Sequence, residues 1–422
     1  MKVLIITYYW PPAGGSGVQR WLKFVKYLRD FDIEPVIYTV DNPAYVIEDA
    51  SLLADIPEGV EVIRQPIFEP NSILSFFGKK NKKQSGGFLN PNPSAIGKLL
   101  QYIRANYFIP DARKYWIRPS VKYLEQYVRE NDIDAVISTG PPHSMHLIAM
   151  QLKERTGMTW ISDFRDPWTE IDYFHQLPLS KRSKLKHIEL EEQVVSKSDV
   201  VIVVGETMKK NFEKYNDEIH VVTNGYDSKV SELNEELDMS FTITHIGMMN
   251  ADRNPTILWS VLKEICDENA DFKKDLKVQL IGKVATEVEK DLASLNEKNI
   301  ALIEYLDHQD ARLYQQRSQL LLLAINNVPS AKGIITGKIF EYLQARRPIL
   351  GIGPIHGDAA NIVNETTSGI MVDFDDAAGL KGTILEYYDK FKKGDLTVSS
   401  SNIEKYHRKE LTRELSVILI QD

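Results

Sequence analysis

Residues 320–353 read LLLLAINNVPSAKGIITGKIFEYLQARRPILGIG and join two strand patterns through a loop and a helix pattern. The flanking runs 320–325 and 349–353 are apolar without alternation, which is typical of parallel strands buried on both faces. Between them, a loop with two glycines leads into a helical segment that starts near Lys338. This strand-helix-strand order predicts a parallel sheet with crossover helices.

The same alternation runs through most of the chain. Further strands are predicted at residues 3–7, 35–40, 135–139, 159–164, 200–205, 241–247, 278–282, 301–306 and 369–374. A chain of 422 residues is too long for one core and predicts about two domains. We therefore predict an α/β protein with two Rossmann-like, doubly wound parallel-sheet domains that face each other across a cleft.

Two changes in composition suggest how the chain is divided. The polar stretch 228–240, SKVSELNEELDMS, precedes a fresh strand and marks a domain boundary. We predict a first domain over 1–234, a second over 235–401, and a helix over 402–422. Residues 71–119 interrupt the rhythm of strands and helices, so they are predicted to be a long insertion in the first domain.

Composition excludes several classes of protein. The net charge of −8 gives no support for general nucleic-acid binding. The single cysteine, Cys266, excludes an intramolecular disulfide and a cysteine-based zinc site, and its amphipathic segment predicts a buried helix residue rather than a nucleophile. No apolar stretch approaches the length of a membrane span, and the N-terminus lacks a signal-peptide pattern. We expect a cytoplasmic protein.

The glycine-rich segment 11–20, PPAGGSGVQR, joins the first strand to the first helix. Glycines allow a close backbone approach and a helix N-terminus favours an anion, which predicts that Gly14 and Gly15 contact a phosphate or sugar. A plain tight turn is the alternative. A dinucleotide fingerprint is a third reading, but Arg20 stands where its last small residue belongs.

The segment 162–168, SDFRDPW, follows a strand end, where ligands bind in open α/β sheets. Asp163 and Asp166 are candidates to hydrogen-bond a sugar hydroxyl or to act as a base. Trp168 is a candidate to stack on a sugar. The alternative is an ion pair within the loop, between Arg165 and an aspartate.

Two further segments follow strand ends in the first half. In 139–146, TGPPHSMH, His143 is a candidate catalytic group in the cleft, and packing in the core is the alternative. In 223–227, TNGYD, the Asn-Gly pair predicts a turn first of all. Its place beside the predicted linker indicates a contact near a hinge.

In the second half, Arg253 follows the first strand, and its fork of donors suits a diphosphate. Asn254 is predicted to cap a helix with Pro255 at its first position. A solvated surface arginine is the alternative.

The strongest candidates lie at the start of the helix near 338. Thr336 and Gly337 stand at its N-terminus, Lys338 is placed to reach a phosphate, and Glu341 lies about one turn further on. A carboxylate suits the paired hydroxyls of a ribose, and an exposed ion pair on the helix is the alternative.

These motifs, in this order, resemble the retaining glycosyltransferases of the family numbered four, which have the GT-B fold. The pattern Lys-x-x-Glu-Tyr-x-x-x-x-x-Pro, which begins at Lys338, is the most specific part. The segment 162–168 resembles a loop of bacterial members that build surface polysaccharides, including transferases of amino sugars.

The resemblance implies roles for these residues. Glu341 would bind the donor's ribose, Arg253 and Lys338 would neutralise its diphosphate, and Gly14 and Gly15 would lie near the distal phosphate and sugar. Arg165 and Trp168, with their loop, would face the acceptor or the transferred sugar. No metal or other cofactor is expected, because most relatives need none.

One departure separates the sequence from many relatives. Gly333 stands where they carry a glutamate that touches the transferred sugar. It leaves open a scaffold subunit that binds nucleotide without turnover. A second alternative is a sugar-nucleotide epimerase on the same fold, with Asp163, Asp166 and His143 as its acid and base groups.

The acceptor is expected to be a glycan or a polyprenyl-diphosphate-linked glycan. Residues 73–83, ILSFFGKKNKK, place phenylalanines beside four lysines, a composition that suits an anionic membrane surface. They predict a peripheral contact at the inner face of the plasma membrane, and a solvated loop is the alternative.

Overall fold

The computed structural model describes residues 1–45, 47–69, 95–227 and 236–420. The chain forms two compact units, Met1–Asn224 with Arg408–Asp422, and Gly225–His407. The predicted boundary between residues 234 and 235 and the lysine-rich segment 73–83 lie outside the described residues. Each unit is described below by itself.

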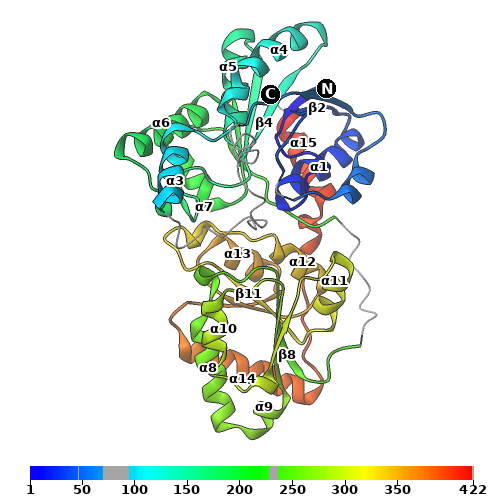
Figure 1. Ribbon diagram of the computed structural model, residues 1–422. Coiled ribbons are helices and arrows are strands. Elements are labelled where there is room, and N and C mark those ends of the chain that lie inside the picture. The colour runs from blue at the N-terminus through cyan, green and yellow to red at the C-terminus, as the bar shows by residue number, and fades with distance from the viewer. Residues whose placement is uncertain (46, 70–94, 228–235, 421–422) are drawn as a thin grey trace. The chain divides into compact units, whose positions relative to one another are not determined.

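The first unit contains, in its described part, a seven-stranded parallel sheet in the order β3-β2-β1-β4-β5-β6-β7 (Figure 1). Its strands are β1 Lys2–Ile6, β2 Glu34–Val40, β3 Glu61–Gln65, β4 Ala135–Gly140, β5 Thr159–Phe164, β6 Val200–Val203 and β7 Ile219–Val221. Its helices are α1 Ser16–Leu28, α3 Ala95–Tyr107, α4 Ile117–Glu130, α5 Ser144–Thr156, α6 Lys181–Lys197, α7 Glu206–Phe212 and α15 Arg408–Ile420.

Both faces of this sheet are buried, as the unbroken apolar runs predict. Leu4 and Ile6 of β1 belong to a core that α4 to α7 help to form, whereas Val3 and Ile5 pack on the other face with α1 and α15. Doubly wound packing therefore covers the sheet with helices from distant parts of the chain.

The second unit contains, within the described residues, a six-stranded parallel sheet in the order β10-β9-β8-β11-β12-β13. Its strands are β8 Phe241–Ile246, β9 Leu276–Ile281, β10 Ile300–Ile303, β11 Leu320–Ala324, β12 Ile349–Ile352 and β13 Gly369–Val372. Its helices are α8 Thr256–Glu268, α9 Ala270–Asp275, α10 Thr286–Leu292, α11 His308–Arg317, α12 Lys338–Ala345, α13 Asp358–Glu365 and α14 Ala377–Lys393.

The prediction of two Rossmann-like parallel-sheet domains is confirmed. Cys266 is buried in α8, also as predicted. The predicted Asn254 cap is wrong: α8 begins at Thr256, and the Asn254 side chain instead accepts a hydrogen bond from Trp259 Nε1 at 2.8 Å. The Trp259 indole of α8 therefore binds the Asn254 side-chain oxygen that was predicted to cap a backbone N–H at the start of the helix.

The chain passes between the units twice, after Asn224 and after His407. Just inside the second unit, the two passing segments pair, because Tyr226 forms an isolated parallel bridge with His407 and donates its N–H to Tyr406 O at 3.1 Å. After the second passage, α15 packs against α1 in the first unit.

Candidate functional site

In the second unit, the predicted donor residues gather at the carboxyl end of β8. Gly247 follows β8 directly and has φ 114, a backbone conformation that favours glycine. A β-carbon there would lie 2.5 Å from Lys338 Cε and 3.0 Å from its Nζ. The first side chain of α12 therefore lies against the strand end, where ligands bind in open α/β sheets.

Lys338 and Arg253 are near enough to affect each other's charge. Burial lowers the pKa of the Lys338 ammonium to about 8, Arg253 adds to the lowering, and Glu341 opposes it. Arg253 is held by its own loop, since Nη1 donates to Met248 O at 2.9 Å. Two neighbouring cations make a local field that favours a bound anion.

Glu341 lies one turn into α12, within electrostatic reach of Lys338. Its Oε2 accepts a hydrogen bond from Nε2 of Gln315, a buried side chain of α11, at 2.9 Å. This contact orients the carboxylate. Sequence reasoning missed Gln315, because nothing in its polar helix marks it as a neighbour of α12.

Two buried polar atoms at this site have no hydrogen-bond partner within the described residues: Thr336 Oγ1 and His245 Nε2. Burial lowers the pKa of His245 to about 3, so the ring is neutral at physiological pH. Its Nδ1 lies 3.0 Å from Leu322 O, a carbonyl that can only accept, which assigns the proton to Nδ1. Unpaired buried polar atoms are uncommon in protein cores, and a water molecule or a polar ligand at this site would satisfy them.

In the first unit, Arg165 brings three of the predicted loops together. Its backbone N–H donates to the O of Gly140, the last residue of β4, at 3.0 Å, and its Nη1 donates to the O of Gly17, in the first turn of α1, at 2.6 Å. The ion pair with an aspartate, which was the alternative for this loop, is present, since Nε lies 3.4 Å from Asp166 Oδ2. The Asp166 side chain is 46% exposed, which leaves it accessible to a ligand.

Asp163 is fully buried among donors. It pairs with Arg20 (Nη2 to Oδ1, 2.8 Å) and accepts from Trp21 Nε1 at 2.7 Å and Thr139 Oγ1 at 2.8 Å. Burial raises the pKa of its carboxyl, but Arg20 and the hydrogen bonds outweigh burial and hold the pKa below its usual value. This geometry favours a structural role over the predicted base, because the carboxylate is saturated with bonds.

Arg20 extends this network to the predicted hinge segment. Its Nη2 donates to Val222 O at 2.7 Å and its Nη1 donates to Thr223 O at 3.0 Å. The last residues before the chain leaves the first unit are thereby bound to the sheet through the Arg20–Asp163 pair.

His143 and Trp168 stack on each other, with ring centroids 4.3 Å apart and planes 3° from parallel. Both are buried, and Trp168 Nε1 donates to His187 Nδ1 at 3.0 Å. Burial and the neighbouring charged or ionisable groups lower the pKa of His143 well below 6.5. The His143 ring thus covers the Trp168 face that was predicted to stack on a sugar. His143 itself packs in the core, which was the alternative to its catalytic role.

Gly14 and Gly15 form the turn before α1. Gly15 has φ 82, and Gly14 donates its N–H to Ile47 O at 2.9 Å. A β-carbon on Gly14 would lie 2.8 Å from the Ile47 side chain. The first turn of α1 holds no acidic side chain, so its N–H groups suit an anion.

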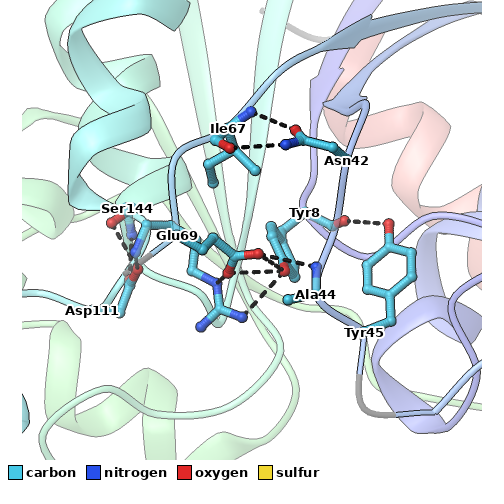
Figure 2. A network of polar contacts seen from close by, with 9 residues as sticks. Tyr8, Asn42, Ala44, Tyr45, Ile67, Glu69, Asp111 and Ser144 are labelled. Carbon is cyan, nitrogen blue, oxygen red and sulfur yellow. Dashed lines mark hydrogen bonds and ion pairs between the residues drawn. The ribbon is translucent and has the colours of Figure 1, made fainter. Parts of the chain in front are cut away.

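A network that sequence reasoning missed lies beside these loops (Figure 2). Tyr8, two residues past β1, donates its hydroxyl to the buried Glu69, which also accepts from Ala44 N at 3.0 Å. Arg113 Nε lies 3.0 Å from Glu69 Oε1, and its guanidinium lies 4.4 Å above the Tyr8 ring. Burial raises the pKa of the Tyr8 hydroxyl, which keeps it a neutral donor.

Asp111 extends the same network to α5, since it accepts from both N and Oγ of Ser144 at 2.9 Å. The pair of tyrosines directly after the first strand was a usable signal in the sequence. Glu69 and Arg113 gave none, because their contact depends on two segments that approach only in the fold.

Among the described residues, no group of three or more His, Cys, Asp and Glu side chains is placed to hold a metal ion. No helix in the described part of the chain is both long and apolar enough to cross a membrane.

Comparison with known proteins agrees with the architecture. Residues 87–230 match the family model described as Glycosyltransferase Family 4. A search of curated proteins found no match. Among solved structures, Anabaena HepE in complex with UDP aligns over 100% of both chains at 13% identity, with a TM-score of 0.64.

Two other solved structures are also similar. The lipopolysaccharide outer core galactosyltransferase WaaB aligns over 100% of this chain and 99% of its own, at 13% identity and a TM-score of 0.59. A putative UDP-N-acetylglucosamine 2-epimerase from Listeria monocytogenes aligns over 99% and 95%, at 12% identity and a TM-score of 0.54. With the two parallel-sheet units, these alignments show that the chain has the GT-B fold.

Proposed function

We propose that the protein is a glycosyltransferase that moves a hexosyl or N-acetylhexosaminyl group from a nucleotide-diphosphate sugar to a glycan or lipid-linked acceptor. The observation that carries this proposal is the arrangement of Arg253, Lys338 and Glu341 around the N-terminus of α12. The match of residues 87–230 to a glycosyltransferase family model and the UDP bound by HepE support it.

The donor would bind to the second unit. Arg253 and Lys338 would neutralise the diphosphate, with Thr336 Oγ1 and the N–H of Gly337 as further donors. Glu341, oriented by Gln315, would accept hydrogen bonds from the ribose. In the transfer step, negative charge grows on the leaving diphosphate, and these fixed positive groups would stabilise it.

The acceptor would bind to the first unit, beside Asp166 and Arg165. Asp166 is the better base candidate of the two aspartates, since it is accessible while Asp163 is held by three donor side chains. We propose transfer with retention and without a metal, in surface polysaccharide biosynthesis in the cytoplasm. Retention would require no obligatory protein nucleophile.

A sugar-nucleotide epimerase is the second candidate, because the Listeria protein with a similar fold is a putative epimerase. It would use the same nucleotide site. What separates the two is the fate of the sugar, which a transferase passes to a second molecule.

The test is to incubate the purified protein with UDP-glucose, UDP-galactose or UDP-N-acetylglucosamine, with and without polyprenyl-diphosphate-linked glycans. We expect UDP release that depends on the acceptor, together with a glycan longer by one sugar. Interconversion of the UDP-sugar without acceptor would establish the epimerase instead. UDP binding in calorimetry without turnover of any donor would establish a nucleotide-binding scaffold.

A further inference from the structure

Helix α3 exposes an apolar face that nothing in the described chain covers. Its apolar residues recur at helical spacing, and among them Ile96 is 72% exposed and Leu99 58%. The α3 face consists of Ile96, Leu99, Leu100, Ile103 and Tyr107. Surface helices normally turn such a stripe toward the core, whereas no residue of α3 is buried.

The helix is nevertheless fixed to the first unit, beside α6 (Figure 1). Asn106 joins it to the segment before α6, with Nδ2 donating to Pro178 O at 2.8 Å and Oδ1 accepting from Ser180 N at 2.7 Å. Polar contacts therefore hold α3 in place, and its apolar stripe stays exposed.

Aromatic side chains adjoin the carboxyl end of α3. Phe68 and Tyr115, both exposed, pack edge to face with centroids 6.0 Å apart. Lys114 donates to Tyr107 O and lies 5.2 Å above the Tyr115 ring, so it links this pair to the helix. Aromatic rings next to an apolar helix are favoured where a protein meets the boundary between water and lipid.

The charge of this region opposes that of the rest of the chain. Residues 95–119 hold five basic side chains and one acidic side chain, and four of the five remain positive once Arg113 is paired with Glu69, although the whole protein has a net charge of −8. Helix α3 itself carries Lys98 and Arg104 and no acid. A partner for this face must therefore accept both aliphatic side chains and positive charge.

We propose that α3 docks the protein onto an anionic lipid surface, with the α3 face in the acyl boundary and Lys98 and Arg104 at the headgroups. A second copy fits less well, because two such faces would bring the same cations together without an acid on either helix. Nucleic acid would pair with the cations but offers no apolar phase for leucine and isoleucine. The proposal goes beyond sugar transfer and does not depend on it, since lipid binding needs no donor.

The experiment is cosedimentation of the full chain with vesicles of phosphatidylcholine alone or mixed with phosphatidylglycerol, at low and high salt. We expect binding to the mixed vesicles that weakens with salt. The double variant Leu99→Ser, Ile103→Ser should weaken vesicle binding about tenfold or more, because it loses apolar contact. The double variant Lys98→Gln, Arg104→Gln should weaken vesicle binding by a similar factor, because it loses charge. The matched controls, Met239→Ser with Tyr305→Ser and Lys273→Gln with Lys274→Gln, change exposed residues of the second unit and should bind as the parent does.

A second measurement reports depth. In a Cys266→Ser background, an environment-sensitive dye on Leu100→Cys should shift to the blue on mixed vesicles, and the same dye on Met239→Cys should not. Binding by the Leu99→Ser, Ile103→Ser variant equal to the parent's would overturn the proposal, as would a parent protein that ignores anionic vesicles at low salt. A dimer that this variant converts to monomer would assign the face to a second copy.

Discussion

The side chain of Lys338 occupies the space beside Gly247 that a β-carbon at position 247 would need, since its Cε would lie 2.5 Å from that atom and its Nζ 3.0 Å. The strand β8 and the helix α12 are 91 residues apart at this contact, counted from 247 to 338. The end of the strand and the start of the helix are thus in contact, and the absence of a side chain at position 247 leaves room for the Lys338 ammonium.

The first prediction concerns the phosphates. Lys338→Met and Arg253→Met should each weaken UDP binding by about 1.5–3 kcal/mol, the usual worth of a hydrogen bond to a charged group, and leave uridine binding nearly unchanged. Isothermal calorimetry with both ligands measures this, with the exposed Lys332→Met as the matched control. Equal losses for UDP and uridine would mean that these side chains support the fold instead.

The second prediction concerns pH. Because the pKa of Lys338 is lowered to about 8, the free protein loses this charge above that pH, and UDP affinity should fall between about pH 8 and 10. Between about pH 8 and 10.5 the folded state binds fewer protons than the unfolded chain, so this lysine makes stability rise with pH. Below about pH 8 both states hold the proton, so the cost of burying the charge is constant there. Calorimetry in two buffers of different ionisation enthalpy should show proton uptake on binding, which Lys338→Met should abolish.

The third prediction concerns the ribose. Glu341→Gln should weaken UDP by about 1.5–3 kcal/mol and should also remove the preference for UDP over its 2′-deoxy analogue. Gln315→Leu should give a smaller loss of the same kind, since it removes only the bond that orients Glu341. A Glu341 variant that still prefers the ribose form would assign the carboxylate to another task.

The fourth prediction concerns the acceptor side. Asp166→Asn should lower turnover by about 10²-fold or more while UDP binding stays within twofold, because an acid–base group acts on the reaction step. Glu170→Gln, four residues away and exposed, is the control. If UDP affinity falls and turnover per bound donor does not, Asp166 contributes to the donor site.

The fifth prediction concerns stability. Asp163→Ala should destabilise the first unit by about 3–5 kcal/mol, because it leaves the Arg20 guanidinium buried without its carboxylate. The Asp166→Asn variant should unfold at nearly the parent's denaturant concentration. Since the pKa of Asp163 is lowered in the folded state, its contribution should be present at neutral pH and decline as pH falls below about 3.8. If the Asp163→Ala protein is as stable as the parent, the Arg20 and Asp163 side chains do not pair in solution.

The fold was predictable from the sequence because buried parallel strands leave unbroken apolar runs, as in β6 and β12. Strand β3 was missed, since it is an edge strand with charged and half-exposed residues in alternation. An edge strand needs no continuous apolar run, so its sequence resembles a loop.

The place of Gly337 and Lys338 at the start of a helix was predictable from the motif, while the roles of these residues and of Thr336 stay predictions. Side-chain partners far apart in sequence were not predictable. Asp163 was expected to bind a sugar hydroxyl or act as a base, but its carboxylate pairs with Arg20, 143 residues away. No local pattern distinguishes a loop aspartate that faces solvent from one that neutralises a distant arginine.

The place of α15 has a consequence for how the protein is made. Leu411 and Leu415 complete the core around α1, so the unit that begins the chain lacks part of its interior until residue 420 has been synthesised. The second unit, Gly225–His407, is continuous in sequence, so its folding does not depend on residues that are synthesised much later. On the ribosome, the later half can therefore reach its native state first, while the earlier half stays open to chaperones until the final helix arrives.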